Sequence, residues 1–110
     1  KTEINFNNTY LLMPAGNYVD TGASGFDKIF RVDGPTASNE VGKITIELGA
    51  KTPGGGPSTD KPITIAKFNL AGKTAVNTAQ NITIANTQIV NNQSQSLNIT
   101  AQPASFTVGQ

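Results

Sequence analysis

The side chains with the clearest potential for chemistry are aspartates that lie in or beside predicted loops. They are Asp20, Asp27, Asp33 and Asp60. Together their carboxylate oxygens could ligate a hard cation such as calcium. A calcium-binding loop places acids at alternating positions around a central glycine, and the sequence lacks that spacing. We therefore interpret these aspartates as solvated loop acids, and we predict neither a metal site nor a cofactor.

Catalytic side chains are scarce as well. Histidine and cysteine are absent, so the commonest general base and the thiol nucleophile are missing. A glycosidase would need two facing carboxylates, and no spacing pairs Glu3, Glu40 or Glu47. The run of glycines at 54–56 lacks the Lys-Ser/Thr that completes a phosphate-binding loop. The sequence thus predicts no catalytic residue and no enzymatic activity.

Lys67 could in principle form a Lys–Asn isopeptide bond beside a buried acid. It alternates with Phe68 and Leu70, so it points to solvent if Phe68 marks the core face. Because burying an unpaired lysine is costly, we interpret Lys67 as solvated.

The same alternation places Ile63 and Ile65 on the side of Lys67. Exposed isoleucines on a strand favour a contact surface. Alternatively, a bulge before Phe68 switches the alternation and both isoleucines belong to the core. On the first interpretation, Ile63, Ile65 and Lys67 are the candidate binding residues, on an exposed strand face.

Composition limits the kinds of partner that the chain can bind and indicates its location in the cell or outside it. The chain has 110 residues, which fits one domain over 1–110. Its net charge is +1, with scattered lysines and one arginine, so no basic face predicts nucleic-acid binding. No apolar run is long enough for a membrane span or a leader. The lack of cysteine and the abundance of Thr and Asn favour an extracellular or cell-surface location.

Alternating apolar and polar residues predict seven to nine short strands. The clearest pair covers residues 61–70 and 81–90, joined by a turn at 71–75. Further strands are predicted at 2–7, 10–13, 26–32, 41–48, 97–100 and 106–108. In the 26–32 strand, Phe26, Phe30 and Val32 share one face and Lys28 interrupts it. A turn is predicted at 33–35, and no segment shows a helical period over three turns. The expected fold is all-β, an antiparallel sandwich or barrel.

Three of these stretches, 42–49, 62–72 and 81–90, resemble the second half of a cohesin-like domain. A strand with an apolar-x-Phe-x-apolar end leads into a short Ala/Gly turn, and a Thr/Ile-rich strand follows. Residues 3–20 resemble an earlier part of the family. Their apolar places are filled by Ile4, Phe6, Leu11 and Leu12. The resemblance implies a cohesin-like or immunoglobulin-like sandwich of jelly-roll topology, which binds a protein partner through a flat strand face.

Cohesin-like domains usually begin with two strands before the one that Ile4 and Phe6 would occupy. The chain starts too late to contain them. We therefore expect an incomplete sandwich, completed by a separate peptide, a neighbouring subunit or the rest of a split domain. The expected partner is a protein or peptide, with self-assembly by strand exchange as one form.

The sequence leaves two classes of function open. The first is a non-catalytic extracellular module for protein–protein docking, adhesion or assembly. The alternative is a carbohydrate-binding sandwich. Sugar sites normally stack sugars on exposed aromatic rings, and the sequence offers only Tyr10 and Tyr18 for this, because it has no Trp. Loss of glycan binding in Tyr18→Ala would favour the alternative.

Overall fold

A computed structural model describes residues 1–16, 19–51, 56–57, 63–73, 79–90 and 104–107, with the backbone alone at 79 and 104–107. The main element is an antiparallel five-stranded sheet in the order β3-β4-β1-β6-β7. Its strands are β1 (Thr2–Asn5), β3 (Lys28–Val32), β4 (Lys43–Gly49), β6 (Ala79–Ala85) and β7 (Ala104–Thr107). A second antiparallel sheet pairs β2 (Leu11–Leu12) with β5 (Ala71–Gly72). The described helices are η1 (Gly22–Ser24) and α1 (Pro35–Val41).

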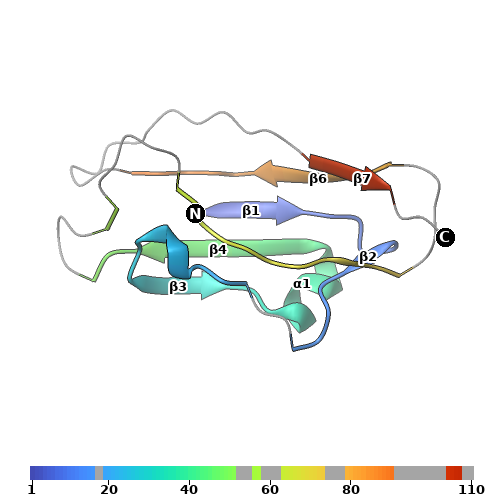
Figure 1. Cartoon of the computed structure of the whole chain (residues 1–110), viewed down its shortest axis with the longest axis horizontal. Helices are drawn as coiled ribbons and strands as arrows, with labels where there is room; N and C mark the ends of the chain where they lie inside the picture. The colour runs from blue at the N-terminus through green and yellow to red at the C-terminus, as the bar shows by residue number, and fades with distance from the viewer. Residues whose placement is uncertain (17–18, 52–55, 58–62, 74–78, 91–103, 108–110) are drawn as a thin grey trace.

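The strand predicted at 2–7 forms the middle of the large sheet, as β1 at Thr2–Asn5 (Figure 1). Ile4 lies opposite Ile44 of β4 on one side and Ile84 of β6 on the other. The predicted face is confirmed, because Ile4 and Phe6 are both buried. Alternation therefore located this strand correctly and chose its buried side.

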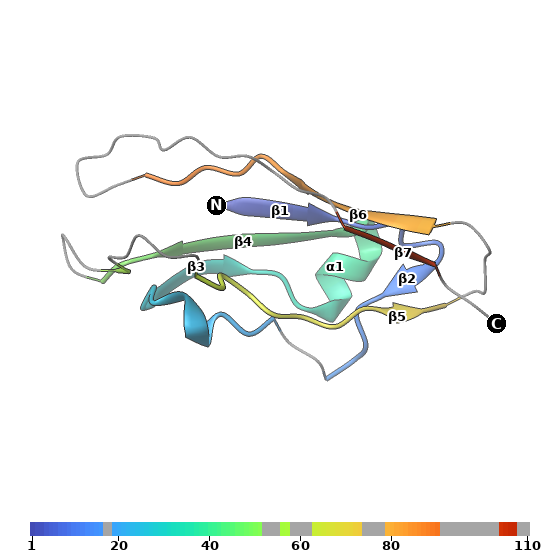
Figure 2. The same ribbon diagram turned by 45° about the horizontal axis from the view of Figure 1, so that its top comes forward.

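The core lies between the inner face of the large sheet and the β2–β5 layer with the segment 63–70 (Figure 2). Its buried apolar residues are Ile4, Phe6, Leu11, Met13, Ile44 and Ile46. Partly buried residues packed against them include Ala66, Phe68 and Leu70. Each fully buried Leu or Ile contributes about 1.5–3 kcal/mol. The fold is thus a β-rich arrangement of antiparallel sheets around an aliphatic core, with one short α-helix in the part described.

The predicted strand pair at 61–70 and 81–90 is wrong as a pair. In the described part of the first segment, 63–70, only Lys67 forms a bridge, with Asp20. β6 instead pairs with β1 and β7. The predicted turn at 71–75 is also wrong at its start, because Ala71–Gly72 forms β5 against β2. Alternation in 63–70 reflects burial of one side on the core, and one-sided burial does not require a hydrogen-bonded neighbour.

The second strand of that pair is confirmed in its first half, since β6 spans Ala79–Ala85. It ends where Asn86 adopts a positive φ of 50°, a left-handed conformation that a strand cannot contain. The predicted continuation to residue 90 is therefore wrong. The strand predicted at 106–108 overlaps β7, and the one at 97–100 lies outside the described residues.

The helix α1 contradicts the expectation of an all-β chain, and the predicted turn at 33–35 is its start. Gly34 is the N-cap and Pro35 takes the first turn, where its missing N–H costs nothing. Gly42 ends the helix with φ 71°, and its N–H donates to the carbonyl of Ser38 at 2.8 Å. A helix of two turns is too short to show the period on which the prediction depended.

Candidate functional site

The strand β3 forms one border of the large sheet (Figure 1). No other described strand pairs with the side of β3 that faces away from β4, and we call this side the β3 edge. Asp33 N donates to Thr45 O of β4 at 3.1 Å. Because hydrogen-bonded positions alternate along an antiparallel strand, the N–H and C=O of Val32 point away from β4. The β3 edge thus carries backbone groups that can bind another strand.

A bulge divides β3 between its two faces. Ile29 lies opposite Leu48, but Arg31 lies opposite Glu47, so Phe30 is the extra residue. Ile29 and Val32 consequently share the inner face with the core residues of β4. The outer face carries Lys28 and Arg31, opposite Gly49 and Glu47.

The β3 edge exposes two adjacent large apolar side chains, Ile29 at 60% and Phe30 at 63%. The Phe30 ring lies over Gly49, where an added Cβ would be only 2.6 Å from Phe30 Cε2. Above the ring, Lys28 Nζ lies 4.9 Å from the centroid, which is a cation–π distance. These contacts hold the ring against the sheet without covering it.

Arg31 and Asp33 form an ion pair at the end of β3. Arg31 Nε donates to Asp33 Oδ1 at 2.9 Å and Arg31 Nη2 donates to Oδ2 at 3.3 Å. The backbone N–H of Thr45 donates to Asp33 Oδ2 at 3.0 Å. Burial raises the pKa of Asp33, but the hydrogen bonds from Arg31 and Thr45 and the charge of Arg31 outweigh it and lower the pKa overall. The carboxylate therefore joins β3 to β4 as an anion.

The candidate binding residues from the sequence lie on the segment 63–70. Ile63 is 39% exposed, Ile65 is half-buried and Lys67 is exposed. Lys67 exchanges two backbone hydrogen bonds with Asp20, each at 2.8 Å. Ile63 and Lys67 are thus accessible, but they do not lie on a regular strand. Their role in binding stays a prediction.

The aspartates from the sequence accept backbone hydrogen bonds rather than converging. Asp20 Oδ1 accepts from Gly22 N and Asp27 Oδ1 accepts from Lys51 N, both at 2.8 Å. Asp60 lies outside the described residues. In the described part of the chain, no three His, Cys, Asp or Glu side chains gather as metal ligands would.

Glu3 and Tyr10 also make local contacts. Glu3 Oε2 accepts from Asn86 Nδ2 at 2.7 Å and lies 3.7 Å from Lys43 Nζ. The hydrogen bond from Asn86 is the main cause that lowers the pKa of Glu3. Tyr10 is half-buried and packs against the core, and Tyr18 lies outside the described residues.

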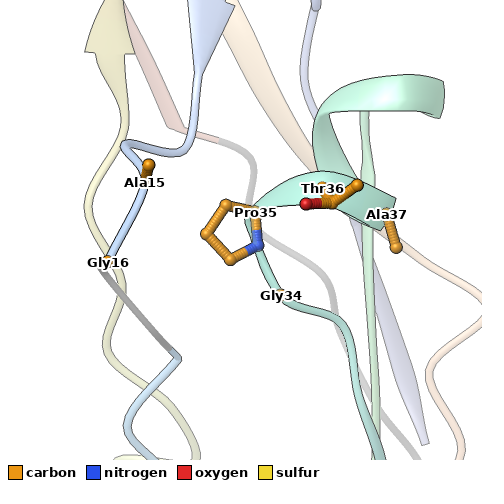
Figure 3. Close-up of a pocket in the computed structure, with 6 residues that line it drawn as sticks. All are labelled: Ala15, Gly16, Gly34, Pro35, Thr36 and Ala37. Atoms are coloured by element: carbon orange, nitrogen blue, oxygen red, sulfur yellow. The ribbon is translucent and has the colours of Figure 1, made fainter.

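A hollow of about 380 Å³ lies between the turn after β2 and the start of α1 (Figure 3). It is lined by Ala15, Gly16, Gly34, Pro35, Thr36 and Ala37. Among these described lining residues, Thr36 supplies the one polar side chain and none is titratable, so they offer no group that could act on a substrate.

Sequence alternation did not reveal the β3 edge, because it places Phe30 on the face of Val32. The bulge breaks that assignment. The one signal in the sequence was the interruption of the apolar face at Lys28.

The comparisons with known proteins found no matching family, curated protein or solved structure. Among the helices described, none has the length and apolar character needed to cross a membrane.

Proposed function

We propose that this domain is a non-catalytic protein-interaction module that works outside the cell or on its surface and accepts a strand from its partner at the β3 edge. One observation carries the proposal. Ile29 and Phe30 are the exposed apolar pair of a border strand whose free side has backbone groups to offer. Strand addition uses these two features together, since main-chain hydrogen bonds supply affinity and alternate side chains supply specificity.

Single exposed apolar residues are common on protein surfaces, but an unpaired border strand with adjacent exposed apolar residues invites aggregation. The exposure of Ile29 and Phe30 therefore requires an explanation. Lys28, Arg31 and the bulge are features that discourage indiscriminate pairing. A border strand that is apolar and accessible, but that carries these charges and a bulge, favours binding of one selected partner over indiscriminate strand pairing.

The finer fold that we propose is a cohesin-like or immunoglobulin-like sandwich. The packing of β2, β5 and segment 63–70 against the inner face of the large sheet supports it. The cysteine-free, Thr- and Asn-rich composition supports the extracellular location. The resemblance to cohesin-like domains supports a docking or assembly role.

Binding of the labelled chain to two arrays tests the proposed function. One array carries extended peptides of about seven residues, the length of an ordinary strand, and the other carries glycans. We expect peptide binding, and we expect Ile29→Lys to reduce it about tenfold by placing a charge on the border. Val41→Lys is the matched control, since Val41 is 65% exposed on α1.

Equal binding by the Ile29→Lys and Val41→Lys variants would exclude the β3 edge as the contact surface. Binding to glycans alone, abolished by Tyr18→Ala, would replace the proposal with the carbohydrate-binding alternative.

A further inference from the structure

We propose that the strand that fits the β3 edge is β3 of a second copy of this chain, paired antiparallel about a two-fold axis. The inference rests on the proposed function, because it needs the β3 edge to accept a strand. In this pairing Ile29 lies opposite Val32 of the second copy, and Val32 N–H is directed at the carbonyl of Ile29 of the second copy. The two large sheets then join into one.

The faces of β3 select this alignment. Residues directly opposite each other in an antiparallel pair lie on the same face of the sheet. With Ile29 opposite Val32, both inner-face residues are apolar. On the outer face, Lys28 comes opposite Asp33 of the second copy, and Phe30 comes opposite Arg31 of the second copy. The pairing thus brings together an apolar pair, an opposite-charge pair and a cation–aromatic pair.

The two neighbouring alignments set inner-face residues opposite outer-face residues, and they also set like charges opposite each other. A shift of one residue one way places Phe30 opposite itself, which sets Asp27 against Asp33 and opposes inner-face Ile29 to outer-face Arg31. A shift the other way sets Arg31 against Arg31 and Ile29 against Asp33. Like charges directly opposite are destabilising.

The bulge argues for a second copy rather than an unrelated strand. The extra residue at Phe30 separates the inner-face residues Ile29 and Val32 by three positions instead of two. A regular strand can pair across this bulge only by setting one of its residues opposite two of β3, as β4 does on the other side. A two-fold axis brings the bulge of one copy opposite the bulge of the other, so both strands carry the same irregular spacing. Because each chain has one β3, the assembly closes as a dimer.

Sedimentation equilibrium of the full chain tests the dimer. A contact centred on five residues is small, so we expect a weak dimer that forms between about 10 µM and 1 mM. Lys28→Glu places like charges opposite each other and should weaken the dimer about tenfold. Lys51→Glu makes the same change in net charge at an exposed loop residue and should leave the dimer as in the wild type.

Cross-linking tests the alignment, since the chain has no cysteine of its own. A mixture of Ile29→Cys and Val32→Cys chains, treated with a mild oxidant, should form a mixed disulfide-linked dimer faster than Phe30→Cys forms a homodimer. The reverse order would overturn the alignment. A thermal melt of each variant separates a lost contact from a lost fold, and Ile29→Lys gives a second variant at a residue that is 60% exposed.

The outcomes distinguish this inference from the proposed function. A chain that stays monomeric at about 1 mM, yet binds array peptides through Ile29, overturns the second copy and leaves the interaction module intact. A dimer that Lys28→Glu and Ile29→Lys leave unchanged also overturns it. A monomer that binds no peptide overturns both proposals.

Discussion

Gly42 joins the end of α1 to the start of β4, and no other residue type fits its position. Its φ is 71°, and an added Cβ would lie 2.6 Å from the backbone oxygen of Phe6. Phe6 N also donates to Gly42 O at 2.9 Å. A change at Gly42 therefore reaches β1 through the backbone rather than through a side chain that could rotate away.

Substituting alanine at three glycines separates backbone strain from steric clash. Gly34→Ala should cost less than about 1 kcal/mol in the free energy of unfolding, because its backbone is extended. Gly16→Ala should cost about 1–3 kcal/mol, since φ is 83° and the surrounding space is open. Gly42→Ala should cost more than Gly16→Ala, because it adds the clash with Phe6. Denaturant unfolding measures all three, and equal losses at Gly16 and Gly42 would contradict the close approach.

At the scale of elements, asparagine side chains connect α1 to the segments on either side of β2. Asn39 Oδ1 accepts from Met13 N at 2.7 Å and Asn39 Nδ2 donates to Met13 O at 2.9 Å. Asn8 Nδ2 donates to the carbonyl of Asn39 at 3.0 Å, near the end of the helix. One asparagine thereby satisfies both backbone groups of Met13, as a neighbouring strand would.

Asn39→Ala should destabilise the chain by about 1–3 kcal/mol for each Met13 backbone group left without a partner. Asn81→Ala, at an exposed residue of β6, should change stability by less than about 0.5 kcal/mol. Thermal and denaturant unfolding compare the two variants. If Asn39→Ala were as mild as Asn81→Ala, Met13 would have other partners.

The ion pair at the end of β3 predicts a dependence on pH. The folded-state pKa of Asp33 lies below its ordinary value of 3.8, so the carboxylate contributes stability above that pH and the contribution is lost as pH falls through the folded pKa. Asp33→Asn should lower the free energy of unfolding at pH 7 and should flatten its decline below about pH 4. Unfolding curves from pH 7 downward measure both, and parallel declines in the two chains would count against the ion pair.

Prediction from sequence succeeded for the strands in which apolar and polar residues alternate and which also form hydrogen-bonded pairs in the sheet. β1 and β4 have apolar faces built on Ile4, Ile44 and Ile46, and those faces are the core. It failed for 63–70, where alternation reflects burial without a ladder, and for α1, which is too short for a period. Gly34-Pro35 and Gly42 were the available signals for that helix.

At the scale of the whole molecule, the candidate site depends on strand order, and no local pattern contains strand order. The sequence favoured Ile63, Ile65 and Lys67 because they share a parity within one segment. The β3 edge exists because β4, β1, β6 and β7 all lie on one side of β3 in the large sheet. The bulge at Phe30 then determined which residues face solvent.

The most direct measurement of the central claim is amide hydrogen exchange of Val32 and Asp33 by NMR, in dilute and concentrated chain. Asp33 N donates to Thr45 O within β4, so its amide should exchange slowly at every concentration. The Val32 amide should exchange rapidly in dilute chain, because it points to the open β3 edge, and should slow as the concentration rises and the second copy pairs. A Val32 amide that exchanges as slowly as that of Asp33 in dilute chain would mean that the β3 edge is already covered, and would contradict the account.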